Sequence, residues 1–139
     1  MLAHAAEFQG FHALNHICGE EDSIRFDLVP SVVFTMPEVA SVGLTEEQCR
    51  EQGLDVRYLK SFYRANGKAV SMDEPDGYCK LIVARDDTLK GAHIMGAHSS
   101  DIIHEAVLAI SAGIDIKTLR SMIHAHPTLS EIIQAALNS

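Results

Sequence analysis

The segment His124–Glu131 places the strongest local constraints on how this chain can fold, and it reads His-Ala-His-Pro-Thr-Leu-Ser-Glu. Pro127 holds its own φ at about −65° and favours an extended backbone at His126. Thr128 and Glu131 have the Ser/Thr-x-x-Glu spacing of a capping box, which predicts a helix with Thr128 as its N-cap. We therefore expect an extended, histidine-bearing stretch that ends at an amphipathic helix. The apolar positions of that helix are Leu129, Ile132, Ile133, Ala136 and Leu137.

The spacing allows two roles for Glu131. As residue N3 of a capping box, it would serve only the helix N-terminus. It would also be able to accept a hydrogen bond from one ring nitrogen of His126, which fixes the tautomer and raises the basicity of the other nitrogen. Such a pair transfers protons near neutral pH. Because a carboxylate has two oxygens, the two roles are compatible, and the spacing leaves both open.

The overall composition is that of an acidic globular domain. Hydrophobic residues make up 47% of the 139 positions and charged residues 22%, which is enough apolar material for a real core. The formal net charge of −8 argues against nucleic acid or an anionic membrane as a partner. No apolar run is long enough to span a bilayer. The N-terminal residues also lack the basic start and apolar stretch of a signal peptide.

The cysteines favour a reducing, cytoplasmic setting. Cys18, Cys49 and Cys79 are far apart and odd in number, so they form neither a CxxC motif nor a disulfide framework. Each is better interpreted as a small core residue than as a reactive thiol.

Strand patterns come first along most of the chain and helix patterns follow, which predicts an α+β layer with helices on one face of a sheet. Residues 55–63 alternate, with Leu59 and Tyr63 on one face and Tyr58 and Phe62 on the other. Strands are predicted at 30–34, 39–44, 55–63, 68–72, 78–84 and 90–97, with turns at Asn66-Gly67, Pro75-Asp76-Gly77 and Asp86-Asp87-Thr88.

Helices are predicted where capping residues precede apolar periodicity. The first covers residues 1–18 and ends at Gly19, but it has no amphipathic partner before Pro30, so its packing partners should lie elsewhere. The others are capped by Thr45, by Ser99 or Ser100, by Asp115 and by Thr128.

The chain carries one candidate proton-transfer pair and no complete active site. It has no GxGxxG, GxxxxGK[ST] or GxSxG motif. Alternation puts His124 and His126 on one face of the extended segment, as part of a metal site would require, and His12 with His16 has i, i+4 spacing. Neither pair has an identified third ligand, so we expect no metal. An isolated His-Glu pair next to an apolar helix suggests that the chemistry is completed by another chain.

The chain resembles the C-terminal interface domain of class I pyridine nucleotide-disulfide oxidoreductases, and among these flavin enzymes the dihydrolipoamide dehydrogenase family most closely. The likeness spans nearly the whole sequence in the family's order, and the HAHPTLSE form of the last stretch favours the lipoamide enzymes. Five stretches carry it: Met1-Leu2-Ala3-His4, Val29–Thr35 with Pro37–Ala40, Ser41–Glu47, Ala65–Ala69 and His124–Glu131.

The resemblance implies a fold, cofactors and residue roles. The fold is an antiparallel sheet flanked by helices that forms most of a homodimer interface. FAD and NAD are the cofactors of the full-length enzyme, and the substrate is dihydrolipoamide on a carrier domain of a 2-oxoacid dehydrogenase complex. His126 matches the base that reaches the partner subunit's active site, and Glu131 matches the carboxylate that orients it. The flavin contacts implied are His126 and Pro127 to the partner's flavin, and Met1, Leu2, Ala3 and His4 to the flavin of their own chain.

The departures from the family pattern are equally informative. The redox-active cysteine pair and both dinucleotide-binding glycine motifs are absent, and Met1 aligns with an internal methionine of the family. The resemblance therefore implies a C-terminal fragment, with residues 1–28 as the tail of the flavin-binding domain and residues 29–139 as the dimerisation domain, inactive alone. Two alternatives stay open: a stand-alone dimerisation module driven by exposed apolar surface on the C-terminal helix, and a fragment of a glutathione reductase-like or mercuric reductase-like enzyme.

Overall fold

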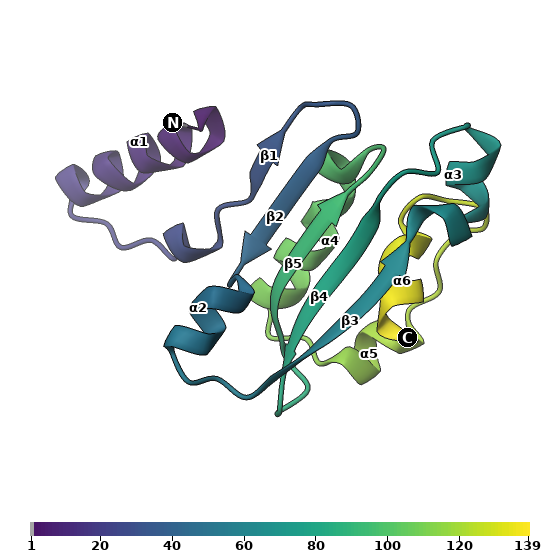
Figure 1. The fold of residues 1–139 in the computed structure, drawn as a ribbon. Coiled ribbons are helices and arrows are strands. Elements are labelled where there is room, and N and C mark those ends of the chain that lie inside the picture. The colour runs from purple at the N-terminus through teal and green to yellow at the C-terminus, as the bar shows by residue number, and fades with distance from the viewer. Residues whose placement is uncertain (1) are drawn as a thin grey trace.

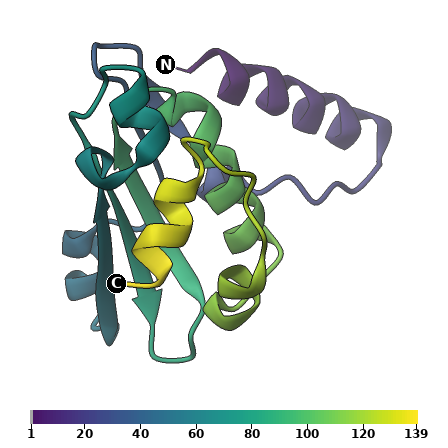
Figure 2. The same cartoon turned by 90° about the vertical axis from the view of Figure 1, so that its right-hand side faces the viewer.

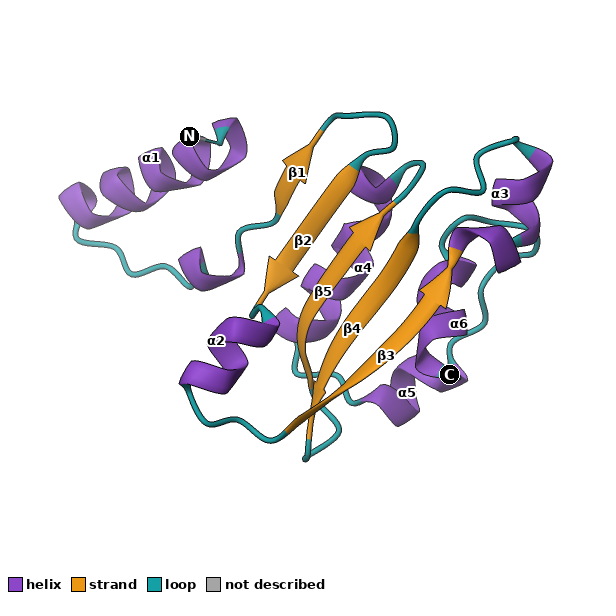
Figure 3. Cartoon of the chain, in the orientation of Figure 1, coloured by secondary structure: helices purple, strands orange, loops and turns teal. Residues whose placement is uncertain are grey.

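The protein is built on one five-stranded antiparallel sheet. The computed structural model describes residues 2–139, so Met1, a predicted flavin contact, lies outside the described residues. The strands run in the order β1-β2-β5-β4-β3, and every neighbouring pair is antiparallel. The predicted α+β class with an antiparallel sheet is therefore confirmed (Figures 1 and 3). The strands are β1 (Ser31–Val33), β2 (Val39–Gly43), β3 (Val56–Phe62), β4 (Tyr78–Ala84) and β5 (Leu89–Met95).

Two helices cover one face of this sheet. α4 packs on β2 and β5, and α6 packs on β3 and β4. Figure 2 shows both on the same side, whereas α2 lies towards the other side. The helices are α1 (Ala3–Cys18), α2 (Glu46–Glu51), α3 (Gly67–Ser71), α4 (Ser99–Ser111), α5 (Ile116–Ser121) and α6 (Glu131–Leu137), with 3₁₀ turns η1 (Phe26–Leu28) and η2 (Tyr63–Ala65). None of the helices within residues 2–139 has the length and apolar character that crossing a membrane requires.

The core lies between the sheet and these two helices. The β3 alternation predicted from sequence holds, because Leu59 is buried whereas Tyr58 on the opposite face is exposed. α6 contributes four of the predicted apolar positions to this core: Ile132, Ile133, Ala136 and Leu137 are each at most 3% exposed. Leu129 precedes α6 and is partly buried against the core. The expectation that this helix leaves apolar surface free for self-association is therefore wrong, since its own sheet covers the stripe.

Two of the predicted helix caps form as expected, whereas the cap of α4 comes from a distant segment. Thr45 forms the predicted capping box with Gln48, and Asp115 caps α5. The N-cap of α4 is His98, not Ser99 or Ser100. Its side chain makes no capping bond. Instead, the Glu38 carboxylate accepts a hydrogen bond from the Ser100 amide at 3.0 Å, from a loop 62 residues away.

The predicted short strand at residues 68–72 is wrong, because this segment is α3. The side-chain oxygen of Asn66 accepts hydrogen bonds from the amides of Lys68 and Ala69, each at 3.0 Å. This N-cap starts a helix where the Asn-Gly pair was expected to form a hairpin turn.

The first helix stands apart from this core. α1 has no buried residue, and Phe8, Phe11, Leu14 and Ile17 are all at least half exposed. Figure 1 shows it extending beyond the β1 edge of the sheet. The helix has no packing partners within residues 2–139 that bury its apolar side chains, as its sequence suggested.

We expect Gly96→Ala to destabilise the fold by about 2–4 kcal/mol, because it combines backbone strain with overpacking. Gly96 has φ of +153°, and a Cβ there would overlap the fully buried ring of Tyr63. Urea unfolding followed by circular dichroism measures the change. Gly10→Ala is the matched control, because Gly10 has open space around it in α1 and should be neutral or slightly stabilising. Equal stability of the Gly96 variant and the wild type would contradict this account.

Candidate functional site

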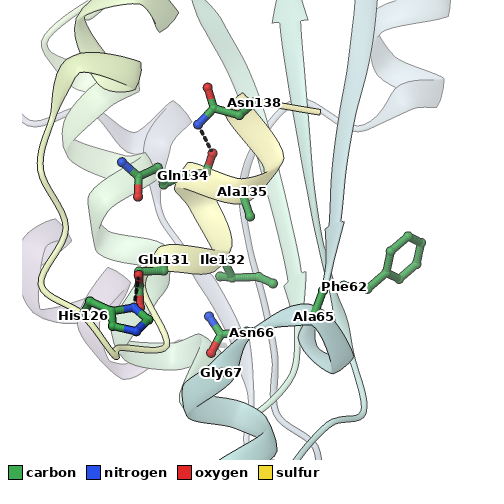
Figure 4. A pocket seen from close by; sticks show the side chains of 10 residues that line it. All are labelled: Phe62, Ala65, Asn66, Gly67, His126, Glu131, Ile132, Gln134, Ala135 and Asn138. Atoms are coloured by element: carbon green, nitrogen blue, oxygen red, sulfur yellow. Dashed lines mark hydrogen bonds and ion pairs between the residues drawn. The ribbon is translucent and has the colours of Figure 1, made fainter.

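The structure brings His126 and Glu131 together at the start of α6. His126 Nδ1 and Glu131 Oε1 are 2.9 Å apart, and Figure 4 shows the two side chains in contact. The second oxygen, Oε2, accepts a hydrogen bond from the backbone amide of Thr128 at 2.7 Å. One carboxylate thus binds both the imidazole and the backbone, as the two compatible roles of Glu131 required.

The capping box itself is only half formed, and α6 begins later than predicted. Thr128 is not the N-cap, because its hydroxyl donates to the Ala125 carbonyl at 2.7 Å instead of accepting from Glu131. The helix begins at Glu131 with Ser130 as N-cap. The residues between Pro127 and Ser130 form a compact turn, and the Glu131 carboxylate reaches back across it to His126.

The pair is arranged asymmetrically with respect to solvent. The His126 side chain is 77% exposed, whereas that of Glu131 is 23% exposed. The pKa of the Glu131 carboxyl is lowered below its ordinary value, mainly by the hydrogen bond from the Thr128 amide and next by that from His126. Glu131 is therefore held as an acceptor for one ring nitrogen, while the rest of the imidazole faces outward.

His124 points away from His126 and into the domain. Its side chain is 4% exposed, and Nε2 lies 3.1 Å and 3.3 Å from the two carboxylate oxygens of Glu105 in α4. Burial raises the pKa of Glu105, with a smaller opposing effect from His124. The sequence did not predict this pair, because nothing in the local pattern connects residues 19 positions apart. The two histidines thus bind different carboxylates, and no cluster of three or more His, Cys, Asp or Glu able to hold a metal occurs in the described part of the chain.

An open cleft of about 260 Å³ lies beside the His126–Glu131 pair. It separates α6 from the turn formed by η2 and α3, as Figure 4 shows. The cleft places His126 at the edge of a concave surface that contains both amide and apolar side chains. Its lining comprises Phe62, Ala65, Asn66, Gly67, His126, Glu131, Ile132, Gln134, Ala135 and Asn138.

The other predicted flavin contacts lie far from this cleft. Leu2, Ala3 and His4 are at the N-terminus of α1, where Leu2 is the N-cap without a capping side chain and the first turn carries no acidic residue. His4 Nε2 is 2.8 Å from the Pro30 carbonyl oxygen. α1 lies beyond the β1 edge of the sheet, whereas α6 packs near the β3 edge (Figure 1). The two sets of residues therefore do not form one site within this chain.

This fold and the position of the pair can be compared with known proteins. A family model described as "Pyridine nucleotide-disulphide oxidoreductase, dimerisation domain" matches residues 29–137. The chain belongs to this family. The chain is similar to the solved structure of LpdA from Mycobacterium tuberculosis, with a TM-score of 0.90 and 28% identity over 99% of this chain and 30% of that one.

Curated relatives agree with this membership. The chain is 47% identical over 136 residues to dihydrolipoyl dehydrogenase of Bacillus subtilis (strain 168), covering 97% of this chain and 29% of the relative. It is 44% identical over 142 residues to dihydrolipoyl dehydrogenase of Synechocystis sp. (strain ATCC 27184 / PCC 6803 / Kazusa), covering 98% and 30%. The chain thus spans about 30% of the length of these relatives.

We expect the Glu131 carboxyl to titrate below its ordinary value of 4.5 in the folded dimerisation domain and to return towards it in urea. Because the folded pKa is the lower one, these hydrogen bonds stabilise the fold above the unfolded pKa, and this stability is lost as pH falls through the folded pKa. His126→Gln should raise the Glu131 pKa only part of the way, since the Thr128 amide is the larger cause. Carboxyl ¹³C NMR measures each midpoint, and a Glu131 midpoint at or above 4.5 in the folded domain would contradict the geometry.

We expect Glu105→Ala to destabilise the domain by about 1–3 kcal/mol, because it leaves the buried His124 imidazole without its acceptor. Glu105→Gln keeps a side-chain oxygen and should cost clearly less. Urea unfolding at pH 7 separates the two variants. If Ala and Gln at this position gave the same stability, the contact with His124 would have no energetic importance.

Proposed function

We propose that this chain is the C-terminal part of a dihydrolipoamide dehydrogenase and supplies the acid–base pair of its dithiol reaction. The observation that supports this most directly is the contact between His126 Nδ1 and Glu131, on a largely exposed imidazole at the edge of a cleft. No hydrogen bond to His126 Nε2 is found within residues 2–139, so this nitrogen is available to an incoming group. The names of the curated relatives agree with the proposal.

In the proposed reaction, His126 accepts a proton from dihydrolipoamide through Nε2. Deprotonation gives the thiolate, which is the nucleophilic form of sulfur. The Glu131 carboxylate accepts from Nδ1–H, so it selects the tautomer with a free Nε2 lone pair and stabilises the imidazolium that forms. The other Glu131 oxygen remains on the Thr128 amide, which keeps the carboxylate in place during the transfer.

The proposal includes FAD and NAD in the full-length enzyme. The N-terminus of α1 fits a contact with an electron-rich flavin edge, because its free amides lack a capping side chain and its first turn has no acidic residue. Leu2, Ala3 and His4 would provide this contact, and His126 with Pro127 would face the flavin of the partner. When bound, FAD would supply a two-electron acceptor between the dithiol and NAD. The isolated fragment is not expected to retain either cofactor or to catalyse the reaction.

Residues 1–28 are proposed to complete the flavin-binding domain and residues 29–139 to form the homodimer interface. The largely exposed apolar side of α1 supports the first part, because nothing within residues 2–139 buries those side chains. The outward-facing His126 supports the second part, because its target must lie outside the domain. The remaining partner would be the carrier domain that presents the lipoyl dithiol.

Reconstitution tests this function. The chain would be combined with an upstream polypeptide that carries the flavin- and NAD-binding domains and the redox-active cysteine pair. Dihydrolipoamide-dependent reduction of NAD would be followed by the absorbance of NADH. We expect activity only when both parts are present. Two folded parts that associate without any such activity would contradict the proposal.

In the reconstituted enzyme, we expect His126→Gln to lower turnover by about two to four orders of magnitude, the usual range for a positioned acid–base group. Folding should be retained, because the side chain is mostly exposed. His104→Gln is the matched control, since His104 is exposed on α4 and absent from the cleft lining. Normal turnover by the His126 variant would show that the base has been assigned wrongly.

A further inference from the structure

We propose that Asn66 is a positioning residue that holds the turn between Pro127 and Glu131 through a hydrogen bond to the Thr128 carbonyl. This inference rests on the proposed function for its catalytic consequence, but the contact itself is a property of the chain. Asn66 Nδ2 donates to the Thr128 carbonyl oxygen at 3.1 Å, across 62 positions of sequence. The same Thr128 residue donates its amide to Glu131 Oε2. Asn66 therefore reaches the His126–Glu131 pair through a single residue.

The Asn66 side chain is hydrogen-bonded through both its oxygen and its nitrogen and is nearly fully buried. The residue is 7% exposed, and its Oδ1 accepts from the amides of Lys68 and Ala69 at the start of α3. The amide group is thereby oriented, because its oxygen is fixed by two backbone donors and its nitrogen must face the other way, towards Thr128. In an asparagine side chain exposed on the surface, water would compete for these hydrogen bonds and the amide group would not keep one orientation.

The turn that carries Asn66 is itself attached firmly to the sheet. The backbone amide of Asn66 donates to the Tyr63 carbonyl at 2.8 Å, and the backbone amide of Tyr63 donates to the Gly77 carbonyl at 3.1 Å. The Tyr63 ring is fully buried beside Gly96, and its hydroxyl donates to the Ala97 carbonyl at 3.0 Å. Tyr63 thus joins the end of β3 to the ends of β4 and β5, and Asn66 extends this rigid support to the catalytic turn.

The hydrogen bonds within the turn itself do not fix its position relative to the sheet, as the bond from Asn66 does. The hydrogen bonds of the Thr128 hydroxyl to Ala125 and of the Thr128 amide to Glu131 lie within seven consecutive residues. Such contacts shape the turn without fixing where it lies relative to the sheet. Asn66 supplies an attachment on the cleft side, while His124 with Glu105 supplies one on the α4 side. A misplacement of about 1 Å at a reacting group can cost about a hundredfold in rate, so this attachment bears on catalysis.

Asn66→Ser is the most informative substitution. Serine is as good an N-cap as asparagine, so the start of α3 should be kept. Its hydroxyl is too short to bond the α3 amides and reach the Thr128 carbonyl together, and the variant adds no charge near Glu131. Asn138→Ser is the matched control, because Asn138 lines the same cleft but donates only within α6, to Gln134.

In the reconstituted enzyme, we expect Asn66→Ser to lower kcat for dihydrolipoamide oxidation about tenfold, within the hundredfold that misplacement can cost, with the KM for NAD unchanged. In the 139-residue chain, the Glu131 pKa should rise towards its ordinary value, because its bond to the Thr128 amide loosens. The Asn138 variant should leave the Glu131 pKa unchanged, and His104→Gln, which lies outside the cleft lining, is the control for kcat. A purely structural role for Asn66 would lower the melting temperature but leave kcat and the Glu131 pKa of the folded chain unchanged, and that result would overturn the proposal.

A measurement on the wild type covers the case in which the variant does not fold. The side-chain amide protons of Asn66 should exchange with solvent at least tenfold more slowly than those of Asn138, as expected for a buried, hydrogen-bonded amide. Equal exchange would overturn the proposal without any substitution.

The proposed function and the role of Asn66 can fail separately. If His126→Gln is fully active while Asn66→Ser still shifts the Glu131 pKa, the proposed function is wrong and the attachment through Asn66 stands. If His126→Gln is inactive and Asn66→Ser changes nothing, the attachment is wrong.

Discussion

The two oxygens of the Glu131 carboxylate connect the helix that packs in the core to the imidazole that faces outward. Oε1 contacts His126 Nδ1, and Oε2 accepts from the Thr128 amide, so the side chain cannot turn without breaking a bond to the backbone. Because Glu131 is the first residue of α6, its position is fixed by the burial of Ile132 and Ile133 behind it. The hydrophobic packing of α6 thus determines how the Glu131–His126 pair is oriented.

The turn before α6 is held from both sides by residues distant in sequence. His124 is buried against Glu105 of α4, and Thr128 is bonded to Asn66 beside β3. α4 packs on β2 and β5 while Asn66 follows β3, so both halves of the sheet take part in placing His126. The antiparallel order β1-β2-β5-β4-β3 matters to the site for this reason.

Two exposed features of the chain have a role in the proposed enzyme. His126 faces solvent although its partner is well held, and α1 presents half-exposed phenylalanine side chains that no part of residues 2–139 buries. Burying these apolar side chains against another domain would be favourable, because it removes apolar surface from water. These features are consistent with a domain whose chemistry and remaining contacts are completed by other parts of an assembly.

The sequence by itself determined the features that depend on neighbouring residues. These include the alternation of β3, the capping box of α2, the Asp115 cap and the closeness of His126 to Glu131, all set by short spacings and side-chain reach. Only the tertiary structure decided that Glu38 caps α4, that Asn66 bonds Thr128, and that His124 turns inward to Glu105. The physical reason is that these hydrogen bonds join segments 19 to 62 positions apart, and folding of the sheet must bring such groups together before either partner is available.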